Sequence, residues 1–369
     1  MSTAADHQPS RPSPADPPAI IVPEDSDADM MEGSGDYYAA DTESYATSLS
    51  SSVFNFNFVN GRRFHSYQEG RYKFPNDERE QGRLNTLHHI FKLLMGGKLF
   101  LAPIDTEKPL RVLDIGTGTG MWAIEVGDAF PRLQWIVGND LSPIQPTTVP
   151  PNVCFEVDDV EVSWPPRKPF DFIHARYMGG SIGDWPGLFK QAYEQLAPGG
   201  WIEFQEFSHI PGYSQDNSVP ADNSVGRLYD LIEEGCNLMG RPATIGDKLP
   251  LFAADAGFIN IQHQVFPIPM GAWPKDPHMK EIGAMNMLAL LDGLEAFSII
   301  LFTQVLGWRP EEVTVFLAKV RQDTMKKGVH LLSNFNVMYA QKPLDETPEE
   351  TKAEDATAEG EREEGDKPE

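Results

Sequence analysis

The sequence predicts an α/β fold organised around a doubly wound parallel sheet, and three observations support this prediction. Short apolar segments alternate with helical or turn segments, as parallel strands joined by crossover helices do. A glycine-rich turn follows the first apolar segment, and polar residues follow the others. The strand-like segments span residues 110–115, 134–139, 153–157, 170–174 and 201–207. Because such sheets bind ligands outside the carboxyl ends of their strands, the residues after each segment are candidate binding residues.

The first strand contains Asp114 and runs into glycines at alternate positions, Gly116, Gly118 and Gly120, before a helix that begins near Met121. Glycine is needed where the backbone turns with positive φ or lies directly against a ligand. The spacing G-x-G-x-G differs from the G-x-G-x-x-G that places a pyrophosphate at a helix N-terminus. An acidic residue here would repel a pyrophosphate, but it suits a cationic ligand with an amino group, such as S-adenosylmethionine. A tight turn without a ligand is the alternative.

The second and third strands also end in carboxylates. Asp140 follows Asp114 by twenty-six residues, a distance that suits a bond to the two ribose hydroxyls of a nucleoside. Asp140 could instead belong to a turn, because Asp and Ser-Pro favour turns. After the third strand, Asp159 offers an acceptor for the exocyclic amine of adenine, and Val160 offers an apolar wall for its ring.

Polar residues continue along the fourth and fifth strands. His174, Arg176 and Tyr177 come at the end of the fourth strand, where a substrate would meet the ligand. Glu203 and Glu206 lie on an otherwise apolar fifth strand, and buried carboxylates are costly unless they are paired. We therefore expect one of the two to face the cleft. Before this strand, Leu196-Ala-Pro-Gly-Gly is expected to form a tight helix-to-strand turn.

The flanking segments are predicted as follows. Asn76 or Asp77 caps a helix that Gly96-Gly97 ends. Later elements are a helix over 249–258, a strand over 259–268, helices near 278–306 and 310–327, and a last strand over 332–339. The insertion Lys275–Leu306 is expected to cover a substrate. For two sets of side chains, the sequence leaves both a role in the site and a role in packing open. They are the histidines His65, His88 and His89, and the methionines Met279, Met285 and Met287.

Charge and composition divide the chain into three parts. Residues 1–52, acidic and rich in Pro and Ser, and residues 344–369, acidic and of low complexity, are expected to be disordered tails. Residues 1–50 hold ten Asp and Glu against one Arg, and residues 344–369 hold twelve against three basic residues, whereas the whole chain carries −25. The folded part, 53–343, is thus mildly acidic, without a basic footprint for nucleic acid. It comprises an N-terminal helical segment (60–103), a ligand-binding core (110–207) and a substrate-covering part (208–343).

Other features limit location and chemistry. The N-terminus lacks the positive start and apolar run of a signal peptide, so we expect Cys154 and Cys236 to be reduced thiols in a cytoplasmic or nuclear protein that is not secreted. The apolar stretch Ala284–Phe302 contains Asp292 and Glu295 and fits an amphipathic helix better than a membrane span. No cluster of His, Cys and carboxylates has metal-ligand spacing.

Taken together, these motifs resemble the class I S-adenosylmethionine-dependent methyltransferases. Four match that family in order and spacing: Val112–Gly120, the acidic end of the second strand, Asp158-Asp159, and Leu196-Ala-Pro-Gly-Gly. More narrowly, the chain resembles the fungal LaeA-like methyltransferases from about Tyr67 to Pro343. The stretches that carry this likeness begin at Tyr72 (YKFPNDERE), Gly97 (GKLFLAPI), Asp140 (DLSPIQP), Val149 (VPPNV), Phe172 (FIHARY) and Asp184 (DW).

The resemblance implies a Rossmann-like, seven-stranded fold whose last strand is antiparallel. It implies a methionine-amino contact at Asp114, contacts at the three glycines, a ribose contact at Asp140, and adenine near Asp159 and Val160. Prolines after the second strand indicate that the usual helix there is short or replaced by a loop. An oxygen acceptor would also need a base: His174 suits this by its ordinary pKa, near 6.5, with Glu206 and His209 as rivals.

Three functions stay open at this point. The first is methylation of a small-molecule acceptor, at O or N, in fungal secondary metabolism. The second is a regulator of secondary metabolism that acts in a nuclear protein complex, with the acidic tails as docking segments. The third is a binding module without turnover. A dehydrogenase is disfavoured by the glycine spacing and by Asp159. No membrane partner is expected.

Overall fold

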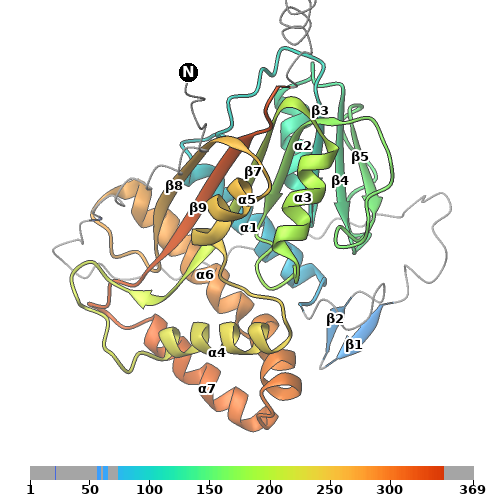
Figure 1. Ribbon diagram of the computed structural model, residues 1–369. Coiled ribbons are helices and arrows are strands. Elements are labelled where there is room, and N and C mark those ends of the chain that lie inside the picture. The colour runs from blue at the N-terminus through green and yellow to red at the C-terminus, as the bar shows by residue number, and fades with distance from the viewer. Residues whose placement is uncertain (1–20, 22–55, 60, 65–73, 345–369) are drawn as a thin grey trace, which may run out of the picture.

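The computed structural model describes residues 21, 56–59, 61–64 and 74–344. Within them a seven-stranded sheet has the order β5-β4-β3-β6-β7-β9-β8 (Figure 1). Its strands are β3 (Arg111–Ile115), β4 (Trp135–Asp140), β5 (Val153–Val157), β6 (Phe170–Arg176), β7 (Leu196–Tyr213), β8 (Ile259–Pro269) and β9 (Leu332–Gln341). The pairs from β5 to β7 are parallel, whereas β9 is antiparallel to both β7 and β8. The predicted doubly wound sheet, its strands and its antiparallel last strand are confirmed.

Helices cover both faces of the sheet because successive side chains of each strand point to opposite faces. On one face, Leu113 and Ile115 pack with residues of α3 (Trp185–Gln195) and α5 (Leu249–Asp255). On the other face, Val112 packs against α2 (Met121–Ala129). Helix α1 (Glu78–Leu94) packs there as well, against β9 and α6 (Pro277–Ile300).

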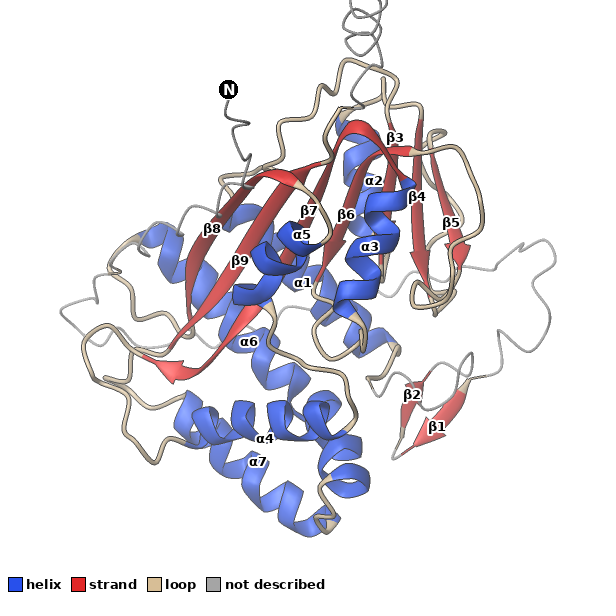
Figure 2. Ribbon diagram, viewed as in Figure 1, coloured by secondary structure: helices blue, strands red, loops and turns tan. Residues whose placement is uncertain are grey.

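A separate helical layer lies beyond the carboxyl ends of the central strands (Figure 2). It consists of α4 (Ser224–Leu238), α6, the π-helical turn η2 (Leu301–Val305) and α7 (Pro310–Thr324), which share one apolar core. By length and composition, the helix Pro277–Val305 could cross a membrane, but 61% of its most apolar window is buried in the protein. Burial in this layer accounts for its apolar character.

Helix boundaries follow their predicted signals. The side chain of Asp77 caps α1 by accepting a hydrogen bond from Glu80 N at 3.1 Å. Pro310 begins α7, and a loop joins β4 to β5, as the prolines there indicate. The 3₁₀ turn η1 (Gly246–Lys248) precedes α5, and a short hairpin of β1 (Asn57–Val59) and β2 (Arg62–Phe64) precedes α1.

The segment Leu196–Gly200 is the beginning of β7, yet it contains the sharp turn that the sequence predicts. Phe170 pairs with Leu196 and Phe172 pairs with Trp201, so one residue of β6 lies opposite four residues of β7, and Gly199 has a φ of +77°. Its backbone pairs with the chain after β9: Gly199 N donates to Lys342 O at 3.0 Å, and Lys342 N donates to Gly200 O at 2.9 Å. These two bonds satisfy backbone groups of the turn and hold it against the chain that follows β9. Apart from Ile21 and Leu344, the two predicted tails lie outside the described residues.

Candidate functional site

The glycine turn between β3 and α2 has a conformation that other residues rarely adopt. Gly116, Gly118 and Gly120 have φ values of +63°, +57° and +79°. A Cβ added at Gly116 would overlap Met178 Sδ, and one added at Gly120 would overlap the ring of Phe155. The turn therefore needs glycine for its backbone angles and also for the close approach of its neighbours.

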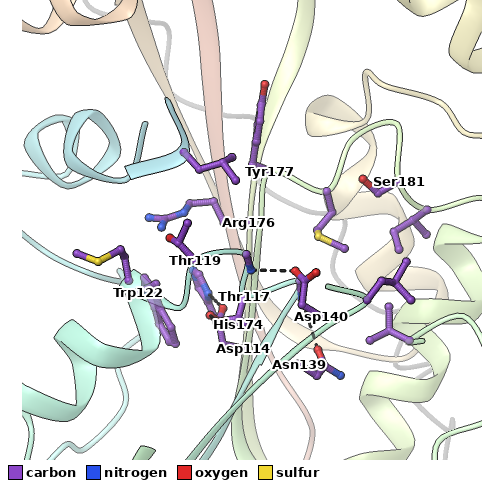
Figure 3. A pocket seen from close by; sticks show the side chains of 18 of the residues that line it. Asp114, Thr117, Thr119, Trp122, Asn139, Asp140, His174, Arg176, Tyr177 and Ser181 are labelled. Carbon is purple, nitrogen blue, oxygen red and sulfur yellow. Dashed lines mark hydrogen bonds and ion pairs between the residues drawn. The ribbon is translucent and has the colours of Figure 1, made fainter. Parts of the chain in front are cut away.

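A cavity lies at this turn, outside the carboxyl ends of β3, β4, β5 and β6 (Figure 3). We call it the first cavity. Helix α1 closes one side of it, with Leu84, Leu87, His88 and Phe91. The other lining residues used below are Asp114, Gly116, Thr117, Gly118, Trp122, Asp140, Asp158, Asp159, Val160, His174, Arg176, Tyr177, Met178 and Ser181. The first cavity thus brings Asp114, Gly116, Gly118, Asp140, Asp159, Val160 and His174 together; Gly120 lies at the N-terminus of α2 just behind it.

Asp140 lies opposite the glycine turn. Its Oδ2 accepts a hydrogen bond from Gly118 N, and its Oδ1 accepts one from Ser142 N, both at 2.9 Å. Burial raises its pKa to about 6, although the two backbone donors act in the opposite direction. The carboxylate is therefore fixed beside the turn and is ionised at neutral pH.

The far end of the first cavity is formed by the segment after β5. Glu161 N donates to Asp159 Oδ1 at 3.0 Å, so the carboxyl group is held by its own loop. Val160 beside it is buried and belongs to the core on the α3 face. An acceptor and an apolar wall therefore stand side by side, as the sequence indicated.

Asp114 and His174 form a buried pair on neighbouring strands. They are partners in the register of β3 and β6, and His174 Nδ1 lies 2.7 Å from Asp114 Oδ1. The other carboxylate oxygen of Asp114 accepts from Thr117 Oγ1 at 2.6 Å. The imidazole stacks on the indole of Trp122 with 3.8 Å between ring centres. Burial lowers the pKa of His174, although the bond to Asp114 acts against this, so the ring is neutral at pH 7.

A half-buried cation lies next to this pair. Arg176 Nη2 is 2.8 Å from His88 Nδ1, and its guanidinium packs over the ring of Phe91. Burial lowers the pKa of Arg176 to about 10 and that of His88 to about 4. Arg176 therefore stays charged, whereas His88 is neutral. The sequence singled out both residues but gave no reason for them to meet.

The two glutamates of β7 have separate environments, because positions three apart on a strand point to opposite faces. Glu203 Oε2 accepts from Leu101 N and Ala102 N, both at 2.7 Å, so it anchors a loop. Glu206 faces a second cavity and accepts hydrogen bonds from Met178 N and Gly179 N. Burial raises the pKa of Glu206 to about 8. As expected, one of these glutamates faces a cleft.

The second cavity lies between the sheet and the helical layer. Residues of α1, β7, α4 and α6 line it, among them Phe74, Glu80, Arg83, Glu206, Phe207, Tyr229, Ile232, Glu233, Asn286, Ala289, Leu290 and Phe297. Leu87, Tyr177 and Ser181 line both cavities. They therefore form the boundary that the two cavities share.

Tyr177 at this junction has a strained backbone. Its φ is +59°, which bulky side chains seldom adopt, and Tyr177 N donates to Gln205 O at 3.0 Å. The change of direction carries the chain from β6 into the loop whose Met178 and Gly179 amides meet Glu206. No local sequence signal predicts a positive φ at a tyrosine.

The insertion 275–306 lines the second cavity through α6, with residues other than the three methionines. Asn286, Ala289, Leu290 and Phe297 line the cavity, whereas Met279, Met285 and Met287 pack in the cores beside it. Helix α4, which the sequence did not indicate, contributes Tyr229, Ile232 and Glu233. His89 is exposed, and His65 and the side chain of His209 lie outside what the structure describes.

The residues of the first cavity fit S-adenosylmethionine. Gly116 and Gly118 line the cavity, Asp140 can accept from a ribose diol, and Asp159 with Val160 suits an adenine. Arg176 supplies a cation for a carboxylate. A pyrophosphate, in contrast, would meet carboxylates at Asp114, Asp140 and Asp159.

The comparisons with known proteins agree with this geometry. A family model described as a methyltransferase domain matches residues 86–244. The chain is 48% identical to "Methyltransferase pytC" of Aspergillus terreus, over 82% of this chain and 93% of that protein. It is 35% identical to "Secondary metabolism regulator LAE1" of Cochliobolus heterostrophus, over 78% and 96% of the two chains. It is 33% identical to "Secondary metabolism regulator laeA" of Aspergillus fumigatus, over 77% and 76%.

Identity at this level over most of both chains shows the family, and the glycine turn with its carboxylates lies inside the matched region. The chain therefore belongs to the LaeA-like class I methyltransferases, and its cofactor is S-adenosylmethionine.

Proposed function

We propose that this enzyme methylates a small molecule of secondary metabolism, at oxygen or nitrogen, and that the second cavity holds this acceptor. The observation that carries the proposal is the junction of the two cavities at Leu87, Tyr177 and Ser181. In this proposal, an acceptor in the second cavity approaches the cofactor across this boundary. The relative pytC supports an enzymatic role, because it is named a methyltransferase and its identity of 48% exceeds that of LAE1 and laeA.

In this proposal, the first cavity binds and orients the cofactor. Asp140 would hold the ribose hydroxyls, Asp159 and Val160 the adenine, and Arg176 the carboxylate of the methionine part. Asp114 stays the predicted partner of the amino group. When bound, S-adenosylmethionine supplies an electrophilic methyl group on a sulfonium. Alignment of an acceptor with such a group can contribute about 7–11 kcal/mol to the acceleration.

Glu206 is our proposed base for an acceptor that loses a proton. It faces the second cavity, its carboxyl group is fixed by two backbone amides, and its pKa of about 8 suits proton transfer near neutral pH. His174 is the alternative. Its ring is stacked on Trp122 and bonded to Asp114, so we assign it a positioning role instead.

The similarity to LAE1 and laeA favours a second candidate function, regulation of secondary metabolism within a protein complex. In that case the acidic tails would dock a partner. The two functions differ in the methylated product, which is a small molecule in the first case and a protein in the second.

The test uses the full-length protein and S-adenosylmethionine with an isotopically labelled methyl group. Extracts of a fungus with and without the gene supply the candidate acceptors, and mass spectrometry follows the label. We expect label in a small molecule, made by the wild type but not by the Asp140→Ala variant. Label found only in protein would contradict small-molecule methylation and would favour the regulatory role.

A further inference from the structure

Among the described residues that line the second cavity, Arg83 is the one cation, and it is neutralised within the protein. Arg83 Nε donates to Glu80 Oε2 at 2.9 Å, and Arg83 Nη2 donates to Glu80 Oε1 at 2.5 Å. Both side chains are at most 4% exposed. The guanidinium also packs over the rings of Phe297 and Tyr177, at 4.7 and 5.5 Å. The edge of the Arg83 guanidinium is thus bonded to Glu80, and its faces pack on aromatic rings. It is therefore a poor partner for an anionic ligand.

Two further carboxyl groups line the same cavity, and neither forms an ion pair with a basic side chain of the described residues. Glu206 is bonded to backbone amides. Glu233, on α4, accepts from Asn237 Nδ2 at 3.0 Å through Oε1. Its other oxygen, Oε2, is buried and has no hydrogen-bond partner within the described part of the chain. A buried acceptor atom left unpaired is costly, so a ligand that donates a hydrogen bond there is favoured.

The remaining walls of the cavity are aromatic and aliphatic. The rings come from Phe74, Tyr177, Phe207, Tyr229 and Phe297, which lie on separate elements around the space. Such rings bind flat apolar molecules well and attract cations through their faces. The cavity therefore combines apolar walls with an excess of acidic groups.

From these contacts we propose that Glu233 is an acceptor-binding residue and that the second cavity selects aromatic molecules that donate a hydrogen bond and carry no negative charge. The donor, a hydroxyl, an N–H or an ammonium group, would bond Glu233 Oε2. A carboxylate or phosphate ester would instead face Glu233, with Arg83 already paired to Glu80 and no other cation among the described lining residues. This inference rests on the proposed function of the second cavity as the acceptor site.

The experiment measures binding of three probes that share one ring system. They are 2-naphthol, 2-naphthylmethylammonium and 2-naphthoate, titrated calorimetrically into the full chain saturated with S-adenosylhomocysteine. We expect the hydroxyl and ammonium probes to bind at least tenfold more tightly than the anion. In Glu233→Gln the advantage of the ammonium over the hydroxyl probe should fall at least fivefold, because the amide oxygen still accepts but the charge is gone.

Glu234→Gln is the matched control, because Glu234 is the next residue of α4 and is exposed. This variant should leave all three affinities unchanged. Equal or tighter binding of 2-naphthoate, an unaltered preference in Glu233→Gln, or no binding of any probe would overturn the inference. The saturation step separates the two proposals: failure to bind S-adenosylhomocysteine would count against the proposed function, whereas normal saturation with a wrong probe order would count against the inference alone.

Discussion

His174 and Asp114 are joined across two central strands by a contact of 2.7 Å, and neither side chain is more than 4% exposed. The contact accounts for one oxygen of Asp114, and Thr117 accounts for the other. Because the pKa of His174 is lowered, a neutral imidazole that donates from Nδ1 satisfies the buried carboxylate. The pair supports the glycine turn from beneath, where Asp114 precedes Gly116 by two residues.

We therefore expect the main effect of His174→Ala to be a loss of stability of the fold and not the loss of a catalytic base. It removes a hydrogen bond to a buried charge and leaves a cavity beneath Trp122, which together should lower the free energy of unfolding by about 2–5 kcal/mol. His174→Asn keeps a short donor and should lose less. Urea denaturation of both variants measures the difference. If His174→Ala unfolds like the wild type but is inactive, the positioning role is wrong and His174 is the better candidate for the base.

If Glu206 is the base, the rate of reaction should increase as the pH rises towards the pKa of this group. The pKa of this group lies at about 8, so a decreasing fraction of it is ionised as the pH falls below 8. With an oxygen acceptor, kcat/KM should rise about tenfold per pH unit up to pH 8 and then level off. Glu206→Gln should lose this rise and about 10²–10⁴-fold in rate. An unchanged profile in Glu206→Gln would assign the proton to another group.

Replacing a glycine of the turn by alanine should disrupt the turn. Gly116→Ala places a Cβ against Met178 at φ +63°, and the left-handed backbone alone costs about 1–2 kcal/mol. We expect at least tenfold weaker binding of S-adenosylhomocysteine and lower stability. Gly82→Ala is the control: Gly82 lies within α1, its added Cβ meets nothing within 4 Å, and the change should add about 0.5–1 kcal/mol of stability. Normal ligand binding by Gly116→Ala would refute a close approach at this turn.

The sequence was sufficient to predict the sheet and the first cavity for a simple reason. In a parallel sheet, the carboxyl ends of neighbouring strands meet at one edge, so Asp114, Asp140 and Asp159 had to converge once their strands were recognised. Strand segments were visible as apolar runs, and the glycines marked the turn. These features are local in sequence.

The second cavity was beyond such reasoning because its walls come from segments distant in sequence. Arg83 on α1, Glu206 on β7 and Glu233 on α4 meet only through packing of the helical layer. Helix α4 was missed altogether, and the positive φ of Tyr177 is imposed by its surroundings and not by its residue type. The opposite directions of Glu203 and Glu206, in contrast, follow from strand alternation and could have been deduced.

The most direct test of the account is calorimetric titration of the full chain with S-adenosylmethionine, S-adenosylhomocysteine and NAD, beside the Asp140→Ala variant. The account predicts that the first two bind and NAD does not. In the variant, the loss of hydrogen bonds to a charged group should weaken binding by about 1.5–3 kcal/mol, or roughly 10–150-fold. Binding of NAD, or equal affinity in Asp140→Ala and the wild type, would contradict the assignment of the first cavity to S-adenosylmethionine.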